Sequence, residues 1–242
     1  MTVAMVAAGD QHTWAVFGRR RKPGGLHRNS TPAASRAAVT FSAFSCEACT
    51  GPLPPSMRLI VEIDTPALLV RHPVLETNIL RLQAAADAAG LQVRPHIKAH
   101  KTPQIAHMQL RAGAVGVTCA KIGEAEVMAD AGIEDIFIAN QIVGEIKLRR
   151  LVALARRVPR LSTAVDGLEC ARGLSDAFST AGLELDVLVE VDTGAGRCGV
   201  APRGLVELSR RVAEMPGLSF VGLMAYAALA YQARGPREQA AA

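Results

Sequence analysis

Strands and helices alternate along this chain from Met57 onward, and this alternation limits the folds open to it. Regular alternation with short connections predicts a parallel sheet, either doubly wound or closed as a (β/α)8 barrel. The short, evenly spaced units favour the barrel. Strands are expected near 65–70, 92–98, 116–120, 135–140, 161–166, 185–192 and 218–226, with helices near 73–90, 102–112, 122–131, 144–157, 168–181 and 202–214.

The stretch RPHIKAHK, residues 94–101, places a lysine among histidines at the end of a predicted strand. Strand periodicity puts Arg94, His96 and Lys98 on one face. A lysine near other cations in a low-dielectric pocket has a lowered pKa, which frees its amine to attack a carbonyl and form a Schiff base. Lys98 is therefore the candidate covalent lysine. The alternative is that Lys98, His100 and Lys101 form a solvated loop after the strand.

Polar residues follow nearly every predicted strand. In a parallel barrel the carboxyl ends of the strands carry the chemistry, so these residues mark the expected site. Asp166 is also a plausible N-cap for the helix that follows it. The set comprises Lys98, His100, Thr118, Lys121, Asn140, Gln141, Asp166, Asp192, Arg197 and Tyr226.

Residues 1–56 differ from the rest of the chain in charge and pattern. They carry six Lys or Arg against Asp10 and Glu47, so they hold +4 of the chain's +5 net charge. Their lack of periodicity predicts a disordered extension or an untranslated upstream reading, ahead of a domain over 57–242; a transit peptide or nuclear signal is a weaker interpretation. The basic balance therefore does not indicate nucleic-acid binding by the folded part.

Membrane and metal classes find little support. No apolar run approaches the ~20 residues that a membrane span needs. Cys46 and Cys49 form a CxxC without a second ligand pair at zinc spacing, so no metal site is predicted. The other three of the five cysteines are scattered, as expected of reduced thiols in a cytoplasmic protein.

Five motifs, in order and spacing, resemble the D-threonine aldolase and D-serine dehydratase-like family, which belongs to the alanine racemase-like, fold type III enzymes that use pyridoxal 5′-phosphate (PLP). The resemblance covers about 59–226. It implies that the predicted barrel is a PLP-binding TIM-type barrel of the alanine racemase N-terminal type. The motifs are TPALLV, RPHIKAHK, GAVGVTCAKIGEAEVMADAGI, DIFIANQIVG and VEVDTGAGRCGV.

The resemblance also implies roles for particular residues. Lys98 matches the lysine that holds PLP, Arg197 the arginine beside the cofactor's phenolic oxygen, and Tyr226 a tyrosine near the cofactor. His96 and Asn140 complete the expected cofactor-binding set, and His100 joins Lys98 as a catalytic candidate. The segment 65–70 would belong to the family's second, β-rich domain.

The chain departs from the family pattern in two respects. Relatives usually read AYHG where this chain reads Ala225, Tyr226, Ala227 and Ala228. The chain also ends after about six barrel strands, before the glycine-rich phosphate loop and the His and Asp or Cys ligands that bind a divalent metal in intact relatives. It is therefore expected to be a truncated member, weak or inactive as given.

The implied function is a PLP-dependent lyase that cleaves a D-3-hydroxy amino acid to glycine and an aldehyde. A D-serine dehydratase-like ammonia-lyase, a non-catalytic PLP carrier and a cofactor-free Schiff-base aldolase remain open alternatives. The expected partner is a small D-amino acid rather than a nucleic acid or a membrane, and a homodimer is a further implication of the resemblance.

Overall fold

The computed structural model describes residues 63–227 of the 242-residue chain. The chain divides into two units, whose described parts are 73–227 and 63–72. The predictions for residues 1–56, including the Cys46 and Cys49 pair, lie outside the described residues. So does Ala228.

The larger unit alternates helices with parallel strands, as the sequence pattern predicts. Its helices are α1 (His72–Ala88), α2 (Pro103–Arg111), α3 (Ile122–Asp130), α4 (Glu145–Ala155), α5 (Leu168–Ala181) and α6 (Leu205–Ala213), the last preceded by the 3-10 turn η2 (Pro202–Gly204). Its strands are β1 (Val117–Cys119), β2 (Asp135–Ile138), β3 (Arg160–Val165), β4 (Leu185–Val191) and β5 (Leu218–Ala225).

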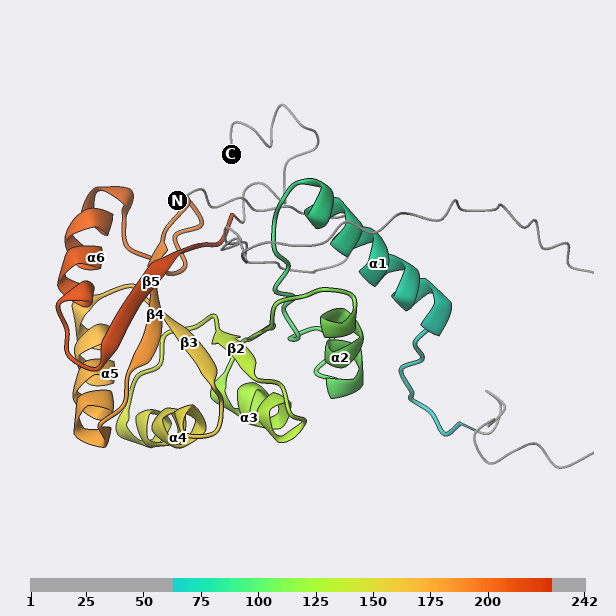
Figure 1. Ribbon diagram of the computed structural model, residues 1–242, viewed down its shortest axis with the longest axis horizontal. Helices are drawn as coiled ribbons and strands as arrows, with labels where there is room; N and C mark the ends of the chain where they lie inside the picture. The colour runs from blue at the N-terminus through green and yellow to red at the C-terminus, as the bar shows by residue number, and fades with distance from the viewer. Residues whose placement is uncertain (1–62, 228–242) are drawn as a thin grey trace, which may run out of the picture. The chain divides into compact units, whose positions relative to one another are not determined.

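The five strands form one sheet in the order β1-β2-β3-β4-β5, and every pair is parallel. Each strand is a neighbour of the next one in sequence, which is the strand order of a barrel; a doubly wound sheet reverses its order at a switch point. Helices α3 to α6 cover one face of this sheet (Figure 1).

The core divides into two layers because successive strand side chains point to opposite faces. Residues such as Ile136, Leu161 and Val187 pack against the helices in the main hydrophobic cluster. The other face, which we call the inner face, carries a smaller cluster: Phe137, Ala164 and Met224, with Ala139 and Leu188 packed against them.

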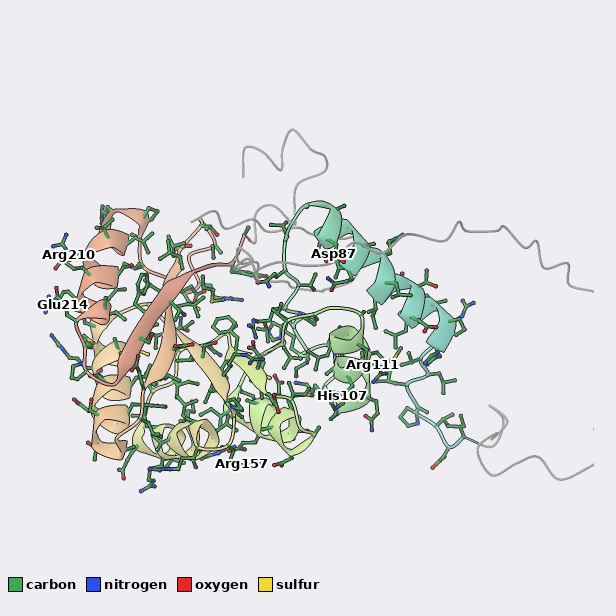
Figure 2. All side chains as sticks on the ribbon, viewed as in Figure 1. Asp87, His107, Arg111, Arg157, Arg210 and Glu214 are labelled. Carbon is green, nitrogen blue, oxygen red and sulfur yellow. The ribbon has the colours of Figure 1, made fainter. Side chains whose placement is uncertain are left out.

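Charged side chains lie on the outer sides of the helices. Arg210 and Glu214, near the end of α6, point away from the sheet (Figure 2). None of the helices in the described part of the chain is long and apolar enough to cross a bilayer. The three cysteines described there, Cys119, Cys170 and Cys198, are free thiols.

Two predicted strands are wrong. Residues 65–70 adopt no strand, because hydrophobic patterning alone supplies no partner for a hydrogen-bonded ladder. The strand predicted at 92–98 is reduced to an isolated parallel bridge between His96 and Thr118. Pro95 has no N–H to donate to a ladder, and the chain turns immediately afterwards. The described sheet therefore has five strands where six barrel strands are expected.

Candidate functional site

Lys98 lies on a tight turn that leaves the sheet next to β1. The Ile97 N–H donates to the Thr118 carbonyl at 2.9 Å, which fixes the start of the turn against the strand. The Lys101 N–H donates back to the Ile97 carbonyl at 2.7 Å and closes it. Lys98 is thus held between two backbone contacts, at the carboxyl end of the parallel sheet, as predicted.

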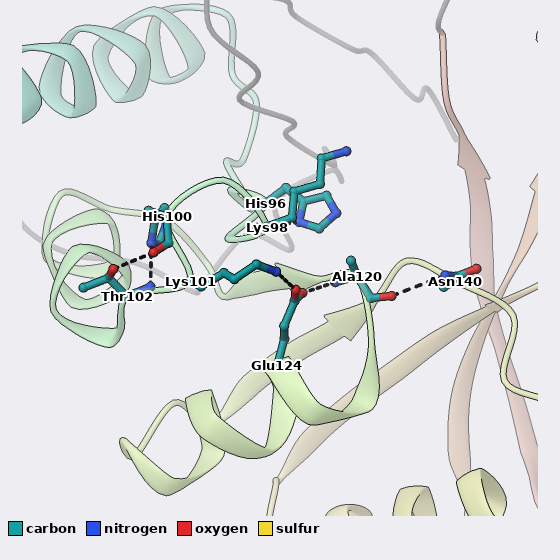
Figure 3. Close-up of polar contacts among 8 residues, drawn as sticks. All are labelled: His96, Lys98, His100, Lys101, Thr102, Ala120, Glu124 and Asn140. Carbon is teal, nitrogen blue, oxygen red and sulfur yellow. Dashed lines mark hydrogen bonds and ion pairs between the residues drawn. The ribbon is translucent and has the colours of Figure 1, made fainter. Parts of the chain in front are cut away.

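His96 lies beside Lys98 (Figure 3). Its Nδ1 accepts a hydrogen bond from the Lys98 N–H at 3.3 Å. Burial and the charge of Lys98 lower the pKa of His96 to about 4, so the ring is neutral at physiological pH. A neutral ring is required here, because a protonated Nδ1 could not accept this bond.

The Lys98 amine is in an environment that favours its neutral form. Burial and the charge of Arg197 lower the pKa of Lys98, and the carboxylate of Glu124 acts in the opposite direction. The shift has the direction expected from the sequence. Its main charged cause is Arg197, however, and not the neighbours of Lys98 in the RPHIKAHK motif.

Arg197 and Tyr226 come together from different strand ends. Arg197 is in the loop after β4, and its Cζ lies 4.3 Å from the centroid of the Tyr226 ring, which follows β5. The Thr193 hydroxyl donates to the Tyr226 carbonyl at 2.7 Å and ties the two loops together. A cation over an aromatic face is attractive, so the pair orients the guanidinium near Lys98.

The loop that carries Arg197 is shaped by two aspartates. Asp192 Oδ1 accepts the N–H groups of Gly194 and Gly196, at 3.0 and 3.1 Å. Asp166 Oδ2 accepts the Gly199 N–H at 3.2 Å. The expectation that Asp166 caps the following helix is therefore wrong, since the α5 N-cap is Gly167, without a side-chain cap. The long-range bond to Gly199 takes the carboxylate instead.

Asn140 and Gln141 follow β2 and contact two different strands. The Asn140 side chain donates to the Ala120 carbonyl at 3.3 Å, which links the ends of β1 and β2 (Figure 3). The Gln141 amide reaches Glu190 on β4, with 2.5 Å between Nε2 and Oε2. Both residues thus lie at the carboxyl end of the sheet, as their sequence positions predict.

The structure does not bring Arg94 and His100 to Lys98. Arg94 pairs with Asp135 at the amino end of β2, so it does not share the Lys98 surface as strand periodicity suggests. His100 lies on the α2 side of the turn, where its Nδ1 accepts the Thr102 N–H at 3.0 Å (Figure 3). Burial lowers the pKa of His100, partly offset by Gln109 and the Thr102 backbone.

Two buried carboxylates near this site were not identified from the sequence. Glu190 is 3% exposed, and burial raises its pKa, with the Gln141 bond as the main opposing cause. Its signal is a single acid within the apolar run VLVEV. Glu124 is 6% exposed in the first turn of α3 and accepts the Ala120 N–H at 2.7 Å. Its position matches that of the acid in a capping box.

Comparison with known proteins places this arrangement in a family. The sequence model of the alanine racemase N-terminal domain matches residues 71–242. The chain belongs to the alanine racemase N-terminal domain family. A D-threonine aldolase from an Arthrobacter species is 45% identical over 168 residues, covering 69% of this chain and 44% of that protein.

Solved structures of related enzymes are also similar to this chain. The D-threonine aldolase from Filomicrobium marinum is 43% identical with a TM-score of 0.72, over 75% of this chain and 49% of that one. The D-threo-3-hydroxyaspartate dehydratase from Delftia sp. HT23 is 30% identical with a TM-score of 0.68, over 73% of this chain and 47% of that one. The chain spans about half the length of the relatives it matches.

Proposed function

We propose that Lys98 binds PLP and that its site serves a lyase of the D-threonine aldolase type, which cleaves a D-3-hydroxy amino acid to glycine and an aldehyde. The observation that carries this proposal is the placement of Lys98 on the turn beside β1, next to His96 and near the Arg197–Tyr226 pair; burial and Arg197 also lower its pKa. A neutral amine is the form that attacks a carbonyl carbon, so an aldehyde cofactor is the ligand that this environment favours. The chain spans about half the length of its relatives, so the lyase activity is proposed for it as well as the cofactor.

The surrounding donors fit a planar, anionic cofactor. Arg197 would face the phenolic oxygen of PLP, and Tyr226 would keep the guanidinium in place. His96, neutral at its pKa of about 4, and Asn140 would complete the binding surface. When bound, PLP supplies an electron sink for the bond that breaks at the substrate α-carbon.

His100 remains a catalytic proposal without support from the geometry. Its ring is engaged with Thr102 and faces α2, on the other side of the turn from His96. A proton transfer by His100 at the reacting atoms would require the turn to rearrange. Lys98 is therefore the residue of this turn on which the proposal depends.

A divalent metal would polarise the substrate hydroxyl in chemistry of this kind. Within residues 63–227, no group of three His, Cys, Asp or Glu side chains is placed to hold a metal ion. The described residues therefore do not fit a metal site, and no step of the proposal uses one.

The aldolase reaction is preferred over dehydration because the D-threonine aldolases are more similar to this chain than the dehydratase is. The two reactions release different products, an aldehyde from one and an oxo acid with ammonia from the other. A PLP carrier would release neither.

Reductive trapping tests the cofactor lysine. The full chain is incubated with PLP, reduced with borohydride and digested, and the modified peptide is identified by mass spectrometry. Lys98 should carry the label, and Lys98→Ala should abolish it, while Lys121→Ala, a change at an exposed lysine after β1, should leave it unchanged. Label on Lys101 or Lys121 in the unmodified chain would contradict the proposal.

Product analysis tests the reaction. Because the chain is expected to be weak or inactive as given, D-threonine should yield at most slow release of acetaldehyde and glycine, and this release should disappear in Lys98→Ala. Release of a 2-oxo acid from a D-3-hydroxy amino acid would instead favour the dehydratase alternative. PLP bound at Lys98 without release of either product is the result expected both of a carrier and of an inactive member of the family.

A further inference from the structure

Lys101 adopts a backbone conformation that lysine rarely takes. Its φ is +50°, in the left-handed region where Cβ approaches the following carbonyl and glycine is the favoured residue. Among the described residues it is the one non-glycine with a positive φ. This conformation costs about 1–2 kcal/mol for a residue other than glycine, so a contact made by the side chain is needed to offset it.

The Lys101 side chain makes an ion pair with Glu124. The ammonium contacts Glu124 Oε1, while Glu124 Oε2 accepts the Ala120 N–H (Figure 3). Each carboxylate oxygen thus holds a different segment. One oxygen holds the end of the Lys98 turn, and the other holds the chain just after β1.

This ion pair differs from a surface pair because its carboxylate is buried. The Glu124 side chain is 6% exposed, whereas that of Lys101 is 57% exposed. Burial raises the pKa of Glu124, but the bonds from Lys101 and Ala120 outweigh it and hold the pKa below its ordinary value. The group is therefore a carboxylate at neutral pH, and its negative charge lies close to the site.

Two charges shift the pKa of Lys98, Arg197 from the loop after β4 and Glu124 from α3. His96, two residues before Lys98, is neutral. Lys101 is on the same turn but directs its ammonium to Glu124. Glu124 is the carboxylate that opposes Arg197 at Lys98.

We infer that Glu124 is a positioning residue for Lys98: it fixes the Lys98 turn through Lys101 and supplies a negative charge that balances Arg197. The inference deepens the proposed function and rests on Lys98 being the reactive lysine of that function. The two roles separate in experiment, because one concerns the charge that Lys98 meets and the other concerns its position.

The charge role predicts a more reactive amine when the carboxylate is removed. The full chain without cofactor is labelled with trace acetic anhydride between pH 6 and 11, and acetylation of Lys98 is measured by mass spectrometry relative to Lys147, an exposed lysine on α4. Glu124→Gln should move the labelling midpoint of Lys98 to lower pH and raise its labelling at pH 7 at least about twofold. A merely structural glutamate would not produce this shift.

The positioning role predicts the opposite effect with a large, oriented reagent. The same variant should load PLP onto Lys98 more slowly, measured by borohydride trapping over time, because the turn is no longer tied to α3. Lys101→Gln should also slow loading, and Lys101→Arg should restore it by keeping the ion pair. Loading of both Gln variants at the unmodified rate would overturn the positioning role.

Glu126→Gln is the matched control. Glu126 lies on the same helix and also pairs with a cation, Arg150, but that pair is on the outer surface. This control should leave both the midpoint and the loading rate unchanged. A midpoint in Glu124→Gln that equals that of Glu126→Gln, or lies at higher pH, would overturn the charge role.

A second variant, Glu124→Asp, tests both roles of Glu124 if Glu124→Gln does not fold. Glu124→Asp keeps the charge and withdraws the carboxylate from Lys101, so it should keep a midpoint near that of the unmodified chain while loading PLP more slowly. Unchanged loading would overturn the inference. Because acetylation needs no cofactor, the charge result stands even if trapping shows that PLP binds another lysine, in which case the proposed function alone fails.

Discussion

The guanidinium of Arg197 lies over the ring of Tyr226, with 4.3 Å between Cζ and the ring centroid. The two residues are 29 positions apart in the chain, on loops that follow neighbouring strands. This contact fixes the cation whose charge lowers the pKa of Lys98. The loops that carry Tyr226, Arg197 and Lys98 are therefore linked electrostatically.

Arg197→Gln should make the Lys98 amine harder to deprotonate. Removing the cation removes one cause that lowers the pKa of Lys98, so the labelling midpoint in the acetic anhydride titration should move to higher pH. This is the opposite direction from Glu124→Gln. Arg210→Gln, on the outer side of α6, is the control and should not move the midpoint. A downward shift in Arg197→Gln would contradict the assignment.

His96→Gln should reduce the decrease in the free energy of unfolding that occurs between pH 6.5 and 4. The pKa of His96 falls from 6.5 to about 4 on folding, so the unfolded chain binds the proton more readily. The resulting stability is fully present above pH 6.5 and is lost as the pH falls towards 4. The loss should be at most about 3 kcal/mol. Urea unfolding at several pH values measures it, and an equal slope in His96→Gln would show that His96 is not its source.

Asp135→Asn should weaken the amino end of the sheet without affecting Lys98. Asp135 is 13% exposed and pairs with both Arg94 and Arg160. Losing its charge leaves both cations short of a partner, at a cost of about 1–3 kcal/mol in unfolding free energy. The labelling midpoint of Lys98 should stay the same, since Arg94 belongs to the frame of the sheet. A shifted midpoint would show that the Arg94–Asp135 pair influences Lys98, which would contradict this assignment.

Asp130→Asn is the control for that change. Asp130 pairs with Arg157 on the surface, and both side chains are more than half exposed. Surface pairs contribute about 0–1 kcal/mol, so urea unfolding should detect little difference.

Gly199→Ala should disturb the loop that holds Arg197 more than Gly196→Ala does. Both glycines have positive φ, +99° and +61°, so either alanine carries left-handed strain of about 1–2 kcal/mol. A Cβ at Gly199 would also lie 2.6 Å from the Val191 carbonyl carbon, whereas one at Gly196 meets nothing within 4 Å. Only Gly199→Ala should therefore slow PLP loading strongly. Equal effects of the two variants would exclude the clash as the cause.

The sequence by itself was sufficient to predict the parallel α/β architecture. The five strands and the helices between them lie close to their predicted positions, because hydrophobic periodicity and the placement of Gly and Pro are local properties of the chain. The parallel arrangement also predicts that the polar residues at the strand ends lie close together. In a parallel sheet, all carboxyl ends lie at one edge.

Local pattern was not sufficient where a partner distant in the chain decides the outcome. Arg94 alternates with His96 and Lys98, yet its charge is drawn to Asp135, 41 residues away. Asp166 follows the pattern of a helix cap, but the Gly199 N–H takes its carboxylate. Glu190 is a single acid in an apolar run and Glu124 is at a capping-box position, but neither local pattern shows that the carboxylate is buried near Lys98. Long-range pairing and desolvation exist only once the chain is folded, so the tertiary structure alone decided which charges meet Lys98.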